Sequence, residues 1–196
     1  PGDESNPKIS PDGQWIAFNA QYEGPNEVYV MPLTGGLPTR LTFDGARANV
    51  VGWKKAHADK PAQIMVTTNR YSTLPNTQLT LIDPSTRAVE QVPLAQVSDG
   101  AYSESGKTLF FTRLPFQGSQ TKRYKGGTIQ QLWRFSDGDA EATPLTTDYP
   151  GSSYAPMLTG PAEGGAGSVI FLSDRDGTME LWSMTQDGKD LKQLTD

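Results

Sequence analysis

Ser10-Pro-Asp-Gly13, followed closely by the alternating run Trp15-Ile-Ala-Phe-Asn19, opens a unit that recurs three more times along the chain. The first four residues are typical of a tight turn, because proline pre-sets φ at the second position and glycine permits a left-handed exit. The run that follows alternates between apolar and polar faces, as a half-buried strand does. This stretch therefore predicts a β-hairpin.

Two anchors define the repeat. The first residues of the expected third strands are spaced by 51, 53 and 49 residues, and an apolar residue in each expected fourth strand keeps the same spacing. The third-strand anchors are Glu27, Gln78, Gln131 and Glu180, and the fourth-strand anchors are Leu41, Val92, Leu145 and Leu194. A period near fifty residues, made of short strands and turns, is typical of a β-propeller, because a single four-stranded blade cannot bury both of its faces alone.

The predicted fold is all-β: one β-propeller array of four four-stranded blades. The expected blades cover residues 1–43, 44–95, 96–148 and 149–196. The second unit is degenerate, since residues 54–61 replace its tight turn. Length varies mainly in the connections, and the two long ones, residues 114–128 and 158–167, are where binding is expected on a rigid propeller.

Composition limits the function. A net charge of −5, from 17 basic and 22 acidic residues, argues against a nucleic-acid groove or an anionic membrane surface as the partner. No apolar stretch approaches the roughly 20 residues of a membrane-spanning helix, and the chain starts at Pro1 without a signal peptide, so we expect any targeting segment to lie upstream. The absence of cysteine excludes disulfides but suits any redox environment. The compartment stays open between cytoplasm and periplasm.

Catalytic and metal signals are weak. The single histidine, His57, lies in a polar loop among lysines, and no Gly-x-Ser-x-Gly elbow is present, so no catalytic residue is assigned. Gly106-Lys-Thr108 resembles the end of a phosphate loop, but Ala101 stands where the motif needs glycine and the repeat explains the segment as a turn. Asp174-Arg-Asp-Gly177 begins like a calcium loop, yet the later ligands do not follow, which favours a turn. We expect no cofactor and no metal.

One basic cluster is a candidate binding site. Lys122, Arg123 and Lys125 surround Tyr124 in the first long connection. At the mouth of a propeller such a patch could attract the carboxylate end of a peptide, because arginine can clamp a carboxylate in two places. The alternative interpretation is a solvated loop that balances an acidic protein.

The repeat also carries a resemblance. Residues 10–18, followed by the strand at 27–30 and by Arg40-Leu-Thr42, resemble the blade repeat of TolB-type and tricorn-type propellers, which also occurs in propellers fused to prolyl-oligopeptidase-like enzymes. Two further segments, Lys122 to Trp133 and Ser173 to Leu191, are similar to consecutive blades of the six-bladed propeller at the amino-terminal end of tricorn proteases. The resemblance covers essentially the whole chain.

The resemblance implies a partial propeller, four blades of six, from a large cytosolic or periplasmic serine peptidase that degrades oligopeptides. The peptidase and PDZ domains would lie elsewhere in the parent chain, and this segment would act as scaffold, oligomer contact or peptide-access filter. Tricorn proteases have an arginine pair near the inner-strand entry of an early blade that anchors the carboxyl terminus of the substrate; Arg47 matches one member, and its partner is missing.

Two alternatives remain: a TolB-like protein-binding propeller without peptidase activity, and the amino-terminal gate of a prolyl-oligopeptidase-like enzyme. The expected partners are peptides or a protein, together with the rest of the parent chain. Since the first and last blades of the segment lack neighbours, we also expect an open arc or self-association through their exposed faces.

Overall fold

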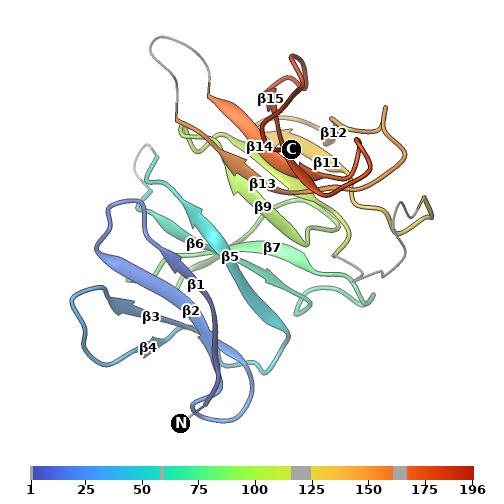
Figure 1. Cartoon of the computed structure of the whole chain (residues 1–196). Helices are drawn as coiled ribbons and strands as arrows, with labels where there is room; N and C mark the ends of the chain where they lie inside the picture. The colour runs from blue at the N-terminus through green and yellow to red at the C-terminus, as the bar shows by residue number, and fades with distance from the viewer. Residues whose placement is uncertain (1, 58–59, 116–124, 161–166) are drawn as a thin grey trace. The chain divides into compact units, whose positions relative to one another are not determined.

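The computed structural model describes residues 2–57, 60–115, 125–160 and 167–196. In these residues every regular element is a β-strand, and sixteen strands form four antiparallel sheets of four (Figure 1). No helix long and apolar enough to cross a membrane occurs in the described ranges. The all-β prediction is confirmed, and each sheet is called a blade below.

The chain forms two compact units, Pro1–Val97 and Ser98–Asp196, with two blades each. Blade 1 contains β1 (Glu4–Ile9), β2 (Trp15–Ala20), β3 (Glu27–Pro32) and β4 (Thr39–Arg40). Blade 2 contains β5 (Ala48–Lys54), β6 (Gln63–Thr68), β7 (Gln78–Ile82) and β8 (Val89–Gln91). Blade 3 contains β9 (Asp99–Tyr102), β10 (Thr108–Thr112), β11 (Leu132–Ser136) and β12 (Thr143–Pro144). Blade 4 contains β13 (Ser153–Leu158), β14 (Ser168–Ser173), β15 (Glu180–Thr185) and β16 (Lys192–Gln193).

The predicted hairpin turn forms as expected. The Ser10 hydroxyl accepts a hydrogen bond from the Trp15 amide at 2.9 Å, and the Gly13 amide donates to the Ser10 carbonyl at 2.9 Å. Gly13 has φ +70°, in the left-handed region that glycine adopts without steric cost. Blade 3 repeats the turn, with the Gly106 amide donating to the Ser103 carbonyl at 2.8 Å. The segment that resembles a phosphate loop is therefore a hairpin turn.

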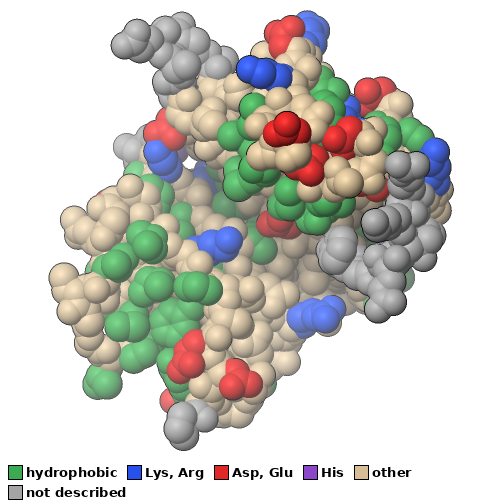
Figure 2. All heavy atoms as spheres, viewed as in Figure 1, with side chains coloured by type: hydrophobic (Ala, Val, Ile, Leu, Met, Phe, Trp, Pro, Cys, Tyr) green, Lys and Arg blue, Asp and Glu red, His purple; other side chains and the backbone are tan. Residues whose placement is uncertain are grey.

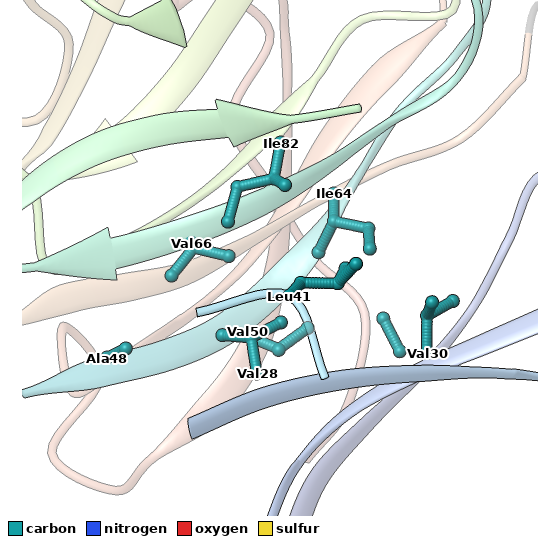
Figure 3. Packing of buried hydrophobic residues seen from close by; sticks show 9 residues of the cluster. Val28, Val30, Leu41, Ala48, Val50, Ile64, Val66 and Ile82 are labelled. Carbon is teal, nitrogen blue, oxygen red and sulfur yellow. The ribbon is translucent and has the colours of Figure 1, made fainter. Parts of the chain in front are cut away.

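Each unit is held together by one blade face packed on another. In unit 1, Ala17, Val28, Val30 and Leu41 of blade 1 pack on Ala48, Val50, Ile64, Val66 and Ile82 of blade 2, and every member is at most 5% exposed (Figure 3). Unit 2 repeats the pattern, with Phe110, Leu132 and Leu145 of blade 3 packing on Leu158, Val169, Phe171, Trp182 and Met184 of blade 4. The surface that blades 1 and 3 contribute to these interfaces is called the forward face of a blade below. The surface that blades 2 and 4 contribute is called the rear face.

A threonine after the fourth strand fastens three of the blades. The Thr42 hydroxyl accepts a hydrogen bond from the Val28 amide at 2.9 Å and donates to the Glu27 carboxylate. Blade 3 repeats this contact through Thr146 and Gln131, and blade 4 through Thr195 and Glu180. The contact ties the outer edge to the third strand although β4, β12 and β16 have only two residues each. We call it the threonine latch.

Blade 2 lacks the latch, because Pro93 stands in place of the threonine. The side-chain oxygen Oε1 of Gln78, the counterpart of Glu27, is consequently buried without a hydrogen-bond partner. Such an oxygen typically costs on the order of 1–3 kcal/mol. Blade 2 is therefore degenerate at its outer strand as well as at its first turn.

Pro93→Thr tests the latch directly. We expect this variant to be about 1 kcal/mol more stable than Pro93→Ala, because both lose the rigidity of proline and only the threonine can donate to Gln78 Oε1. The measurement is urea denaturation of the two variants side by side. Equal midpoints would show that the hydroxyl does not form the latch in blade 2.

Candidate functional site

A hollow in unit 1 lies where the β4–β5 connection meets the rear face of blade 2. It is a shallow hollow, and the space of about 300 Å³ among its lining atoms includes open solvent. Thr42, Thr68 and Thr80 contribute hydroxyl groups to its wall, while Val66, Ile82 and Val89 make it partly apolar. Asp44, Arg70 and Tyr71 also line it. The hollow therefore combines a few polar groups with an apolar floor, as small ligand sites do.

Two of the lining residues, Asp44 and Arg70, form an ion pair. Arg70 Nη1 lies 2.6 Å from Asp44 Oδ2, and the Arg70 guanidinium lies 5.4 Å from the centre of the Tyr71 ring. The other oxygen of Asp44 accepts a hydrogen bond from the Ala46 amide at 2.9 Å, which fixes the carboxylate. Asp44 balances the charge of Arg70, and the Arg70 side chain remains accessible to solvent because it is half exposed.

A second aromatic ring stands near the hollow between two cations. Phe43 is 61% exposed, and its ring centre lies 4.8 Å from the Arg40 guanidinium and 5.7 Å from that of Arg87. Arg40 is held at 2.6 Å by Glu23 and at 3.1 Å by the buried Glu27. The hydrogen bond that Arg40 donates to Glu23, followed by the one that it donates to Glu27, raises the pKa of Arg40 above its usual range. Arg40 is therefore a structural cation that orders this loop.

Arg47, the predicted carboxylate anchor, is exposed at the entry to β5. Its backbone is fixed by Asn69, because the Arg47 amide donates to Asn69 Oδ1 at 2.9 Å and the Asn69 amide donates to the Arg47 carbonyl at 3.3 Å. These bonds tie the β4–β5 connection to the β6–β7 connection, where Arg70 follows Asn69. Arg47 is not one of the residues that line the hollow, but it belongs to a loop that borders it.

The predicted basic cluster is described only in part. Lys125 is exposed in unit 2, ahead of a turn in which the Ile129 amide donates to the Gly126 carbonyl at 3.2 Å. Lys122 and Arg123 lie outside the described residues. Arg47 belongs to unit 1 and Lys125 to unit 2, and each is exposed within its own unit.

The weak catalytic and metal signals are explained by local structure. His57 is half-buried, and its backbone pairs with that of Lys60 in an isolated bridge. Lys54, expected in the same polar loop, instead ends β5 and is only 9% exposed. Within the described residues, no group of three or more histidines and carboxylates could hold a metal ion.

The segment that begins like a calcium loop is a turn, as predicted. The Gly177 amide donates to the Asp174 carbonyl at 3.0 Å. Asp174 Oδ1 accepts hydrogen bonds from the Ser152 amide and the Tyr149 hydroxyl, at 2.9 and 3.0 Å. Asp176 Oδ2 accepts from Gln193 at 2.7 Å. The two carboxylates thus join strands of blade 4 and the connection that precedes it.

One further arginine, Arg175, has no signal in the sequence. Arg175 lies between three aromatic rings, with its guanidinium 5.1 Å from the centre of the Tyr149 ring, 5.4 Å from Trp182 and 5.7 Å from Phe171. Burial lowers the pKa of Arg175 below its usual range. Cation–π contacts of this kind stabilise a desolvated guanidinium. Arg175 is therefore a packing element of blade 4, and only the fold brings its three rings together.

The described side chains around the hollow include groups that can bind a small anionic ligand. Guanidinium groups bind carboxylates through paired hydrogen bonds, and exposed aromatic rings next to them add apolar contact. Arg70 and Phe43 were missed by sequence reasoning because each follows a strand in an ordinary connection. The available signal was the pairing of an arginine with an aromatic neighbour, Arg70-Tyr71, in the loop opposite Arg47.

Comparison with known proteins gives one family. The family model of the tricorn protease N-terminal beta propeller domain matches residues 1–196. Tricorn protease homolog 1 of Streptomyces coelicolor is 30% identical over 194 residues, which is 97% of this chain and 17% of that protein. The chain thus spans about a sixth of the length of this relative.

Solved structures agree on the fold. The crystal structure of the tricorn protease matches all of this chain and 19% of its own, with a TM-score of 0.76 and 20% identity. TolB from Acinetobacter baumannii matches 98% of this chain and 43% of its own, with a TM-score of 0.69 and 20% identity. At these identities the two structures show a shared propeller fold.

Proposed function

Since the chain belongs to the family of tricorn protease N-terminal beta propeller domains, we propose that it is a non-catalytic propeller segment of a longer serine peptidase. There it acts as scaffold, oligomer contact or peptide-access filter, and the catalysis belongs to other parts of the parent chain. The observation that carries this proposal is the family match over the entire length, from residue 1 to residue 196.

The lengths of the relatives support a longer parent. The chain covers 16–17% of two Streptomyces coelicolor relatives, which are named as tricorn protease homologs. In the parent, a propeller of stacked blades would supply a rigid frame whose connections meet the peptide.

The mass of the native polypeptide tests this proposal. An antibody raised against this chain should detect, in a cell extract, a polypeptide several times heavier than 21.3 kDa. The captured polypeptide should hydrolyse oligopeptides and should lose that activity with a serine-directed inhibitor. A native band near 21 kDa, with no peptidase activity, would instead favour a self-contained binding module of TolB type.

We further propose that Arg47 of unit 1 takes part in binding the carboxyl terminus of a peptide, and, as a separate proposal, that Lys122, Arg123 and Lys125 are basic peptide contacts of unit 2. Two observations support the proposal for Arg47. Arg47 is exposed, and the β6–β7 connection that is hydrogen-bonded to it carries Arg70 and Tyr71, which line the hollow. Arg70 could supply the second guanidinium that the sequence alone did not reveal. A paired guanidinium site would favour a free carboxylate over an amide.

Arg47→Ala is expected to weaken binding of a peptide with a free carboxyl terminus by roughly tenfold or more, because a charge-assisted hydrogen bond contributes about 1.5–3 kcal/mol. The same peptide with an amidated terminus should bind both proteins equally weakly. Isothermal titration calorimetry on the 196-residue chain measures both affinities. Lys107→Ala, an exposed lysine in the β9–β10 turn, is the matched control, and an equal loss in this variant would argue against a specific role for Arg47.

A further inference from the structure

The two units place an arginine at the same point of the repeat. Arg70 follows β6 of blade 2, and Arg175 follows β14 of blade 4, each two residues after the end of the strand. The residue before each arginine, Asn69 or Asp174, accepts a hydrogen bond at 2.9 Å from the amide of the residue ahead of the first strand of its blade. Arg70 and Arg175 therefore occupy equivalent positions.

The walls beside the two arginines are equivalent as well. Val66 is paired with Thr80 across β6 and β7. Phe171 is paired with Trp182 across β14 and β15. Each pair lies on the rear face of its blade, and its first member stands four residues before the arginine. Blade 4 thus presents two aromatic rings to Arg175 where blade 2 has a valine and a threonine.

The third ring around Arg175 also has no counterpart in unit 1. Tyr149 is the third residue after the latch threonine of blade 3, and Gly45 is the third residue after that of blade 1. The three rings around Arg175 are thus replaced near Arg70 by a glycine, a valine and a threonine. What lies there instead is the hollow of unit 1, which is lined by Arg70 and by the small residues of both strands.

The hollow suits a flat apolar group. In unit 2 the equivalent guanidinium lies 5.1, 5.4 and 5.7 Å from three ring centres, so the framework of the repeat can hold rings against this arginine. In unit 1 the floor is apolar at Val66 and Ile82 (Figure 3), and the Thr80 hydroxyl already donates to the Val66 carbonyl at 3.1 Å. The Tyr71 ring lies 5.4 Å from the Arg70 guanidinium. An aromatic ring in the hollow would therefore meet an apolar wall, a guanidinium and a second ring.

We propose that the hollow of unit 1 binds the aromatic side chain of the residue at the carboxyl terminus of a peptide. The inference rests on the proposed function, in which Arg47 binds the terminal carboxylate, because the loop of Arg47 borders the hollow. A guanidinium contacts carboxylates through its edge and rings through its face, so Arg70 keeps its ion pair with Asp44 while it stacks on the ring. The hollow is shallow and open to solvent, so the ring is covered on one side only.

Charge by itself selects no particular side chain. On the face of unit 1 in view, Figure 2 shows hydrophobic side chains gathered on blade 1 and no continuous basic patch among the described residues. The net charge of the whole chain is −5. A terminal carboxylate is therefore held by local contacts, and the ring in the hollow decides which peptides bind more tightly.

The test compares two peptides of equal length with free carboxyl termini, one ending in phenylalanine and one in alanine. By isothermal titration calorimetry on the 196-residue chain, the first should bind about tenfold more tightly, or about 1.4 kcal/mol, because its ring gains a cation–π contact and buried area. Thr80→Trp installs the residue that unit 2 has at this position, so it should fill the hollow and make the two affinities equal. Leu37→Trp adds the same ring at a position that is 91% exposed in the β3–β4 connection, and this control should keep the tenfold difference.

A second measurement needs no variant, which matters because Thr80 is buried and a larger side chain there can disturb folding. In methyl NMR spectra of the original chain, the peptide that ends in phenylalanine should shift the signals of Val66 and Ile82 through the ring current. The peptide that ends in alanine should leave them in place. Val169 and Met184, on the rear face of blade 4, are the matched controls and should not respond to either peptide.

The outcomes separate this inference from the proposal on which it rests. Equal affinities for the two free peptides, both tighter than for their amidated forms, would leave the role of Arg47 standing and overturn the aromatic site. Equal affinities for free and amidated forms would overturn the role of Arg47 and, with it, the assignment to a carboxyl-terminal residue. A preference for phenylalanine that persists in folded Thr80→Trp, with unmoved Val66 and Ile82 signals, would place the ring outside the hollow.

Discussion

Phe171→Ala is expected to lower the free energy of unfolding of unit 2 by about 4 kcal/mol. Phe171 is 0% exposed and lies on the rear face of blade 4, packed with Phe110, Leu132 and Met184. The truncated side chain would leave a cavity between two blades that are held together mainly by this cluster, and it would also remove one of the rings around Arg175, which lies 5.7 Å away. Urea denaturation followed by tryptophan fluorescence measures the loss.

Two variants calibrate this measurement. Phe43→Ala removes the same side chain where it is 61% exposed, so we expect a loss of about 0.5 kcal/mol or less. Phe171→Leu keeps most of the buried volume and should fall between the two. If Phe171→Ala costs no more than Phe43→Ala, blades 3 and 4 are not joined through this face.

The four-blade fold could be predicted because repetition adds weak signals together. A single Asp-Gly turn or a single alternating run is ambiguous, but anchors such as Glu27 and Leu41 recur with the same spacing in separate strands. The strand boundaries were less predictable. β4 has only two residues, and the sequence does not show that Thr42, which follows it, turns its hydroxyl rather than its backbone toward β3.

Local backbone irregularities were also not predictable. Asn6 and Ala155 both have φ +53°, each before a proline, and each lies where the register of the inner strand shifts. Asparagine tolerates this conformation, whereas alanine adopts it at a cost of about 1 kcal/mol or more. The preferences of alanine do not indicate this conformation, and Ala155 shares with Asn6 only the proline that follows it and the register shift at that point.

The candidate site was predicted least well. Arg47 is exposed at the loop where the repeat and the resemblance placed it, and its role in binding stays a prediction. Arg70 and Tyr71 come from the β6–β7 connection, and only folding brings them to the Asp44 carboxylate of the β4–β5 connection. Sequence patterns detect residues that share a strand or a turn, whereas a hollow of this kind is built from loops that are far apart in the chain.

Glu27→Ala is expected to lower the free energy of unfolding of unit 1 by about 3 kcal/mol. Glu27 is 0% exposed. Its Oε1 accepts hydrogen bonds from the Gly45 amide at 3.0 Å and from Arg40 at 3.1 Å, and its Oε2 accepts the latch hydrogen bond from Thr42. Removing the carboxylate takes the acceptor away from the Gly45 amide and from Arg40, and it leaves the Thr42 hydroxyl with only the hydrogen bond from the Val28 amide. Glu23→Ala, which removes the exposed carboxylate on the same arginine, should cost far less, because exposed ion pairs are weak.

Glu27 of blade 1 and Gln131 of blade 3 occupy equivalent positions in the repeat. Whether the position holds glutamate or glutamine follows from whether the connection to the next blade offers it a backbone donor or a backbone acceptor. In blade 1 the connection offers the Gly45 amide, a donor, so the side chain must accept. In blade 3 it offers the carbonyl oxygens of Tyr149 and Gly151, at 3.0 and 2.9 Å from Gln131 Nε2, so the side chain must donate.

Reciprocal substitution should therefore destabilise both blades, although each variant installs a residue that the chain already uses at the equivalent position. Glu27→Gln is expected to cost about 1 kcal/mol, because its amide nitrogen cannot accept from a donor. Gln131→Glu is expected to cost about 2 kcal/mol or more at neutral pH, because a carboxylate would face two carbonyl oxygens. Urea denaturation measures both losses. If the two residues exchange freely, the latch threonines alone fix the outer strands and the connections do not select the side chain.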